Sequence, residues 1–208
     1  MGAVSILYSI ADKAAPGRYP SYTTAHVLKA MELISSGSNV GRQQLASSLG
    51  IGEGSVRTIV RRLKGQGLIE IDKAGMELSG KGKELLKALS KRISATELTS
   101  TGLTVGKYDY AVLVRDSAGK INSGVEQRDS ALLAGAKGAT TLVFREKRFQ
   151  LPRLDVAPSP ALSRELAEKL KPGEGDVVII GTADRMLDAD IGSKSAALEL
   201  LKDMIARA

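Results

Sequence analysis

The cations between positions 57 and 64 have the clearest chemical potential in this sequence. Arg57, Thr58, Arg61, Arg62 and Lys64 recur at the three- and four-residue spacing of one helix face. A guanidinium group donates paired hydrogen bonds to a phosphate, or to the O6 and N7 atoms of guanine. The pattern predicts a surface for a polyanion, and the alternative is an ordinary solvated helix face.

The stretch from Gly41 to Leu78 must position these cations. Its first helix ends at Gly50, and its second helix has Ser55 as the predicted N-cap. Each helix carries an apolar stripe on one side. The stripe residues are Leu45, Ala46 and Leu49 in the first helix and Val56, Ile59, Val60 and Leu63 in the second.

Two strands follow, Leu68 to Asp72 and Met76 to Ser79, around a tight turn that places Lys73 at its tip. Helix, turn, helix and hairpin in this order predict a winged helix-turn-helix, whose second helix enters the DNA major groove. We expect the cations of the second helix to meet base edges and phosphates. Further contacts to the DNA backbone or minor groove are expected from Arg42, Gln43, Ser55 and Lys73.

The net charge supports this interpretation. Residues 1–95 contain 14 Lys and Arg and 7 Asp and Glu, an excess of +7, whereas residues 96–208 contain 16 of each. Such a basic surface attracts phosphates without reading a sequence. The predicted partner is therefore double-stranded DNA.

The chain resembles archaeal winged-helix transcriptional regulators that carry an uncharacterised α/β domain at the C-terminus. The residues that carry this resemblance are GRQQLASSLGIGEGSVRTIVRRLKGQGLIE, MELSGKGKELL, VEQRDSALLAGAKGATTLVF and GDVVIIGTAD. The resemblance implies a fold and a regulatory role for most of the chain, but no ligand.

Length and composition fit two modest domains in 208 residues, with 43% hydrophobic and 25% charged residues. We predict an α+β two-domain fold: a DNA-binding domain with an extra N-terminal helix over residues 1–93, a Ser/Thr/Gly-rich linker over 94–106, and an α/β domain over 107–208. The chain has no cysteine, which excludes disulfides and thiolate sites and fits a cytoplasmic protein. No membrane insertion is expected.

Two extra helices have apolar stripes, over residues 3–14 and 81–93. Such helices are a candidate homodimer interface. They equally fit helices that cap the core of a monomer.

The second domain alternates strands and helices, which predicts a mixed sheet with at least one crossover. Ligands of such sheets bind where strands end and helices begin. A small anionic effector is expected at a loop and helix start formed by Gly181, Thr182, Asp184, Arg185, Gly192, Ser193 and Lys194. The alternative is that Gly192 and Ser193 only cap the last helix, with Lys194 solvated.

A second candidate for effector contacts is the polar run Glu126, Gln127, Arg128 and Asp129 at the start of a helix. Acidic residues there also simply complement the helix dipole.

Enzymatic interpretations find little support. His26, the only histidine, belongs to the first domain, which excludes a histidine-based triad or metal site in the second. The phosphate-loop-like GMELSGK has Gly82 where the pattern needs Ser or Thr. Asp184, Asp188 and Asp190 fit a magnesium site or, alternatively, a solvated acidic loop.

We therefore expect a homodimeric, ligand-responsive transcriptional regulator that is not an enzyme and needs no cofactor or metal. The alternatives are an enzyme that acts on a phosphorylated metabolite, with the winged helix as an interaction module, and a non-specific chromatin-type protein.

Overall fold

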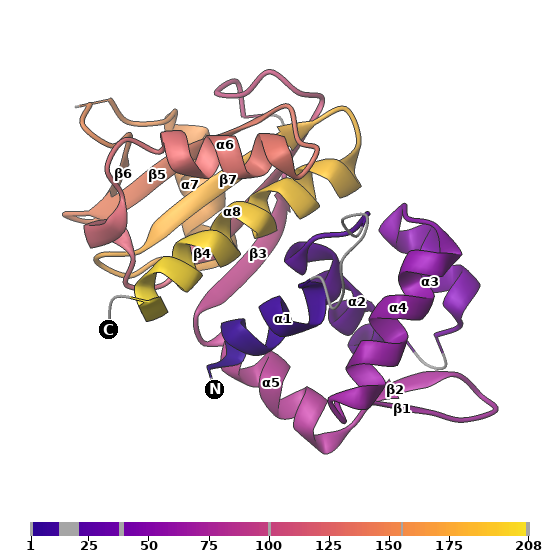
Figure 1. The fold of residues 1–208 in the computed structure, drawn as a ribbon. Coiled ribbons are helices and arrows are strands. Elements are labelled where there is room, and N and C mark those ends of the chain that lie inside the picture. Colours follow the sequence, from indigo (N-terminus) through magenta and orange to yellow (C-terminus); the bar gives the residue numbers. More distant parts are fainter. Residues whose placement is uncertain (1, 13–20, 38–39, 100, 155, 207–208) are drawn as a thin grey trace. The chain divides into compact units, whose positions relative to one another are not determined.

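The computed structural model describes residues 2–12, 21–37, 40–99, 101–154 and 156–206. The chain forms two compact units, Met1–Ser90 and Lys91–Ala208 (Figure 1). The predicted two-domain α+β fold is thus confirmed. The boundary differs from the prediction, because residues 94–98 of the expected linker form a strand of the second unit.

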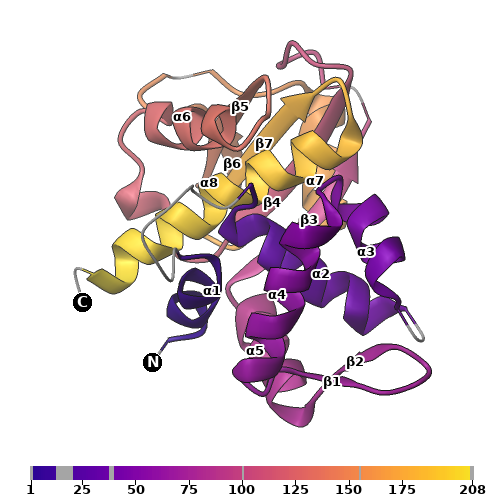
Figure 2. The same cartoon turned by 45° about the vertical axis from the view of Figure 1, so that its right-hand side comes forward.

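The N-terminal unit is helical apart from one hairpin. Its elements are α1 (Ala3–Ala11), α2 (Thr24–Ser36), α3 (Arg42–Leu49), α4 (Glu53–Gly65), β1 (Ile69–Ile71), β2 (Met76–Leu78) and α5 (Gly80–Ser90). Helix, turn, helix and antiparallel hairpin follow one another in the predicted order, and the hairpin projects from the helices (Figure 2). Of the predicted helix over residues 3–14, positions 13 and 14 lie outside the described residues.

The stripe of α1 is covered within the chain. Val4, Leu7 and Ile10 are buried, and α1 contacts α2, α4 and α5. In α5, Leu85 and Leu89 are buried. These two stripes therefore belong to the core of the N-terminal unit and do not form an exposed apolar face for a second copy.

Gly82 explains why the phosphate-loop pattern fails at its last position. The N-terminal end of α5 crosses the backbone of the hairpin so closely that a Cβ at Gly82 would overlap the Leu68 carbonyl oxygen. The Ser79 hydroxyl accepts a hydrogen bond from Gly82 N at 3.1 Å, which caps α5. The glycine is thus a packing requirement of the hairpin.

The C-terminal unit is a sheet in the order β3-β4-β7-β5-β6. Its elements are β3 (Ile93–Leu98), β4 (Tyr108–Val114), the short 3-10 helix η1 (Ala118–Lys120), α6 (Val125–Leu133), β5 (Gly138–Arg145), β6 (Arg148–Gln150), α7 (Pro160–Leu170), β7 (Val177–Ala183) and α8 (Met186–Ala206).

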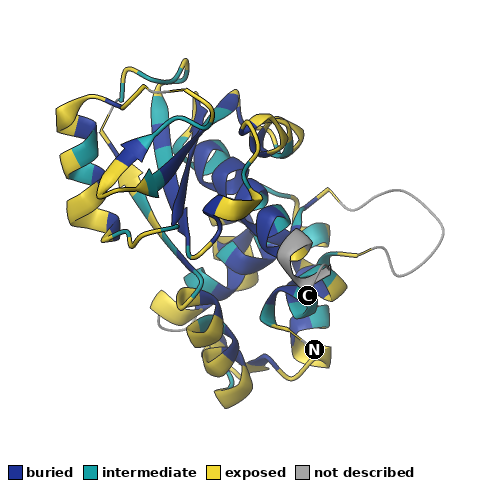
Figure 3. Ribbon diagram, turned by 90° about the vertical axis from the view of Figure 1, so that its left-hand side faces the viewer, coloured by how far each residue is buried: buried dark blue, intermediate teal, exposed yellow. Residues whose placement is uncertain are grey.

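Helices cover both faces of this sheet. One face packs on α7 through a core that includes Leu113, Leu142, Leu166 and Ile180. The opposite face of β4 and β7 packs on α8, and that of β5 packs on α6. The central strand β7 is buried along its whole length, and the sheet core is dark blue in Figure 3.

The sheet is antiparallel where a mixed one was predicted: every described ladder pairs antiparallel strands. The expected crossover exists, because β4 and β5 run in the same direction on either side of β7. Apolar runs indicate where strands lie but not their direction. As a consequence, the carboxyl ends of β4 and β5 lie at the edge opposite to that of β7.

No helix among the described residues has the length and apolar character needed to span a membrane.

Candidate nucleic-acid interface

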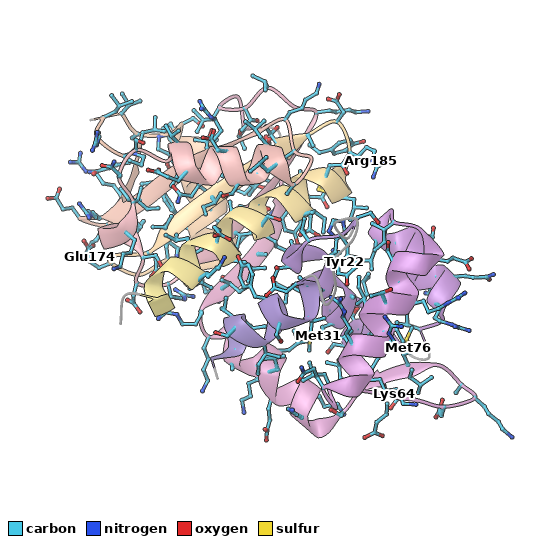
Figure 4. All side chains as sticks on the ribbon, viewed as in Figure 1. Tyr22, Met31, Lys64, Met76, Glu174 and Arg185 are labelled. Atoms are coloured by element: carbon cyan, nitrogen blue, oxygen red, sulfur yellow. The ribbon has the colours of Figure 1, made fainter. Side chains whose placement is uncertain are left out.

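The helix α4 separates apolar and cationic residues onto opposite sides. Val56, Ile59, Val60 and Leu63 are buried. Arg57, Arg61 and Lys64 are exposed at four- and three-residue spacing. Figure 4 shows these surface side chains as sticks and labels Lys64. The buried stripe therefore fixes the three cations, which we call the α4 cationic stripe, toward solvent.

The starts of α3 and α4 come together beside this stripe. Arg42 and Gln43 line a hollow of about 300 Å³ with Glu53 and Arg57. The turn between the helices is made by Gly50, which has the left-handed φ of 62°, and by Gly52, the N-cap of α4. Unpaired backbone N–H groups at helix starts favour a phosphate. The residues predicted for backbone contacts thus lie next to those predicted for base edges.

Lys73 lies at the exposed tip of the hairpin, as predicted. The tip is ordered by Asp72, whose Oδ1 accepts hydrogen bonds from Ala74 N at 2.8 Å and Gly75 N at 3.0 Å. The hairpin is tied to the unit by Met76, whose N donates to the Val40 carbonyl at 3.2 Å. Lys73 is therefore held on a defined wing.

Two residues predicted to contact DNA, Ser55 and Thr58, have side-chain hydroxyl groups that make hydrogen bonds within the N-terminal unit. Ser55 is not the N-cap, because α4 begins at Glu53. The Ser55 hydroxyl lies 2.6 Å from that of Ser21. Thr58 Oγ1 donates to Gly54 O at 3.0 Å, which uses its proton within the helix.

Arg62 also differs from the prediction. Its Nη1 donates to the carbonyl oxygens of Ile10 and Asp12, both at 2.6 Å, and to the Tyr22 hydroxyl at 3.1 Å. The spacing placed Arg62 near the cationic face, but at its half-buried position it meets the C-terminal end of α1. We therefore reassign Arg62 from a DNA contact to a positioning residue that holds α1 against α4.

The partner hydroxyl stays neutral near physiological pH. Burial raises the pKa of Tyr22, and the positive charges of Arg62 and Arg61 only oppose that effect. Tyr22 therefore remains an acceptor for Arg62 across the pH range in which DNA binding is measured.

The observed boundary changes how the charge is divided. Residues 1–90 contain 12 Lys and Arg against 7 Asp and Glu, an excess of +5, which leaves +2 for residues 91–208. The N-terminal unit stays the more basic, but the second unit has an excess of its own.

The predicted anion site at the last helix is not formed. The helix α8 begins at Met186, so Gly192, Ser193 and Lys194 lie in its interior. Lys194 is 1% exposed, its Nζ is 2.8 Å from Asp190 Oδ1, and it lies over the Tyr110 ring. Gly192 packs on Ala136. The expected cap and solvated lysine are therefore a buried part of the helix–sheet interface.

The remaining predicted effector residues do not converge on one site. Gly181 packs against α8, and Thr182 Oγ1 accepts from Gly106 N at 3.0 Å. Arg185 is exposed at the start of α8 (Figure 4) and pairs with Asp188 at 3.0 Å. In α6, Arg128 pairs with Asp129 at 3.2 Å, whereas Glu126 is exposed and Gln127 is buried.

The three aspartates of the magnesium alternative also separate. Asp184 pairs with Lys137 at 2.6 Å, Asp188 with Arg185, and Asp190 with Lys194. Among the described residues, no group of three or more acidic, histidine or cysteine side chains is arranged to hold a metal ion.

Sequence reasoning missed one cluster in the second unit. Arg145, Arg148 and Arg153 line a single pocket with Asn122 and Gln150. The signal was three arginines in FREKRFQLPR, placed around the two-residue turn Glu146-Lys147 between β5 and β6.

Comparisons with known proteins divide the chain at nearly the same place. Residues 25–93 match the model of the CggR N-terminal DNA binding domain, and residues 105–200 match a domain of unknown function, DUF4443. A solved structure of a hypothetical protein from Pyrococcus horikoshii OT3 is 30% identical in sequence, with a TM-score of 0.74. The similarity covers 89% of this chain and 96% of that protein. This chain belongs to the same protein family as that hypothetical protein.

This chain itself combines a match to the CggR N-terminal DNA binding domain with a match to the DUF4443 domain. The chain is a DNA-binding protein of regulator type by its N-terminal domain. No curated protein matches it.

Replacement of Arg62 should reveal its positioning role. We expect Arg62→Ala to lower the free energy of unfolding by about 1–3 kcal/mol, because three acceptors lose a charged donor. Arg61→Ala is the matched control and should stay within about 0.5 kcal/mol, since Arg61 is exposed. Chemical denaturation measures both. Unchanged stability with weakened DNA binding in Arg62→Ala would restore the original prediction.

Replacement of Lys194 should act on folding and not on ligand binding. Lys194→Ala leaves Asp190 buried without this cation, and we expect a loss of about 3–5 kcal/mol of unfolding free energy. The double variant Asp190→Leu, Lys194→Met should regain most of that loss. A single variant as stable as the wild type, measured by denaturant melts, would contradict this assignment.

Proposed function

We propose that this protein is a sequence-specific transcriptional regulator that binds DNA as a homodimer and responds to a small anionic ligand through its second domain. The observation that carries the DNA part is the α4 cationic stripe, Arg57, Arg61 and Lys64, on the exposed side of a helix in the matched DNA-binding domain.

Each part of the N-terminal unit has a distinct role in this proposal. The stripe enters the major groove, where Arg61 or Arg57 donates a bidentate pair to guanine. Arg42, Gln43 and the start of α4 contact the phosphates, and Lys73 contacts the backbone beside the minor groove. The homodimer places two α4 helices in half-sites about 34 Å apart, one helical turn of DNA.

The two other interpretations receive less support. A magnesium-dependent enzyme would need its acidic groups together, and Asp184, Asp188 and Asp190 pair with three separate cations. We accordingly propose a non-enzymatic role. A non-specific chromatin-type protein would bind every DNA sequence by charge alone. DNA titrations distinguish such binding from sequence-specific binding.

The direct test titrates the full chain against its own upstream DNA and against a shuffled duplex of equal length. Fluorescence anisotropy at several salt concentrations should show a preference of about a thousandfold that survives physiological salt. Equal affinities that fall together with salt would reject sequence specificity.

The same titration assigns Arg61. We expect Arg61→Ala to lose about 1–3 kcal/mol of binding free energy at one base and to relax the preference there. Arg128→Ala is the control, because it removes an exposed arginine outside the DNA-binding domain. An equal loss on every duplex would make Arg61 a phosphate contact.

A further inference from the structure

We propose that the pocket at the β5–β6 end of the C-terminal sheet binds a small organic molecule with several negative charges, a phosphate ester or a polycarboxylate. Arg145, Arg148 and Arg153 are its recognition groups. The inference deepens the ligand-response part of the proposed function and rests on that part for its regulatory meaning. The binding itself is testable alone.

The pocket is an open hollow lined by two stretches of the second unit, residues 118–122 and 143–154. Ala118, Ile121 and Asn122 come from the connection after β4. The others are Val143, Arg145, Glu146, Arg148, Gln150, Leu151, Pro152, Arg153 and Leu154, from β5, β6 and the segment after β6. Its volume of about 530 Å³ is in the range of small-ligand sites. Figure 1 shows β5 and β6 at one end of this sheet.

The topology explains why a pocket forms here. β4 and β5 run in the same direction with β7 between them, so both carboxyl ends lie at this edge of the sheet. The segments that follow these two strands therefore converge here and supply lining residues from both. The effector residues predicted after β7, which runs the other way, lie at the opposite end of the strands.

Two of the arginines oppose each other across the hairpin. Arg145 is the direct partner of Arg148 in the β5–β6 ladder, so both side chains lie on one face of the sheet. Like charges directly opposite in an antiparallel pair are destabilising. Glu146 is the only carboxylate among the lining residues and pairs with Arg148 at 3.4 Å, so that with the three arginines the lining keeps a local charge of +2. A bound anion would relieve this repulsion.

The turn that joins these strands is unusual in its residues. Glu146 and Lys147 have φ values of 53° and 63°, the left-handed region that two-residue hairpin turns normally fill with Asn or Gly. Arg153 has φ of 62° as well. The hairpin therefore holds Arg145 and Arg148 opposite each other, although Glu146 and Lys147 do not favour the left-handed conformation of its turn.

Neutral side chains orient the guanidinium groups. The Gln150 amide is oriented so that its oxygen faces Arg148. This oxygen accepts hydrogen bonds from Arg148 Nε at 2.6 Å and from Arg148 Nη2 at 3.0 Å. The Asn122 side-chain oxygen accepts from Arg153 Nη2. Arginine has five N–H donors, so each group keeps donors for a ligand. Val143, Leu151 and Leu154 provide apolar contacts for the body of an organic molecule.

The test measures binding of inorganic pyrophosphate and of citrate to the full chain by calorimetry, one probe for each anion class. We expect saturable binding of one of them and at least tenfold weaker binding in Arg145→Gln and Arg148→Gln. The control Arg185→Gln removes an exposed arginine from the same unit and should stay within about twofold. The preferred probe tells phosphate from carboxylate.

Thermal melts of the same proteins check folding independently. The bound probe should raise the melting temperature of the wild type, and without probe Arg145→Gln should melt at or above it, because this variant relieves the opposed charges and leaves the contacts of Arg148 in place. Absence of saturable binding of both probes up to about 10 mM would overturn the proposal. The proposal would also be overturned if Arg185→Gln weakened probe binding as much as the pocket variants do. The probe would then respond only to the net charge of the protein.

DNA titrations separate this proposal from the proposed function. Without probe, Arg145→Gln should bind duplex DNA as the wild type does. If pocket variants instead weaken DNA binding as Arg61→Ala does and neither probe binds, the arginines contact DNA phosphates and the pocket proposal is wrong. Loss of sequence preference in the wild type would reject the regulator and leave the pocket result standing.

Discussion

Burial of the apolar stripe of α4 determines which way the cations of that helix point. Val56, Ile59, Val60 and Leu63 can reach the core only if Arg57, Arg61 and Lys64 face solvent. The same helix uses Arg62 at its half-buried edge to hold the carbonyl groups at the end of α1. One helix therefore presents charge on one side, packs a core on the other, and anchors a neighbouring helix between them.

In the second unit, burial of a strand likewise determines which groups remain accessible. Its central strand β7 is buried throughout, so the accessible groups of the sheet lie at its ends and edges. At the C-terminal end of β7, Gly181 packs closely on α8, and Lys194 and Asp190 form a buried ion pair. The residues predicted to bind an effector there make structural contacts instead. The opposite end, where β4 and β5 finish, holds three arginines around a hollow. Because the strands are antiparallel, the ends of β4 and β5 meet beside these arginines and lie opposite to the end of β7.

Periodicity was sufficient to predict the helix-turn-helix and the hairpin with Lys73 at its tip. It was insufficient where tertiary contacts decide a side chain's role. Arg62 has the spacing of a groove contact, yet the end of α1 lies within its reach. Lys194 looked solvated because the helix was expected to start at Ile191 and not at Met186. Residues 94–98 read as linker, since an edge strand tolerates polar residues on its outer side. Strand direction, which decides where the loops after β4 and β5 converge, leaves no periodic signal.

The central claim is that α4 reads base sequence, and selection of duplexes from a random pool by the full chain tests it most directly. At physiological salt, the wild type should enrich a motif with two half-sites about 10 base pairs apart. Arg61→Ala should enrich the same motif with the preference lost at one position in each half-site. A pool that stays random for the wild type, while total binding remains strong, would contradict the claim.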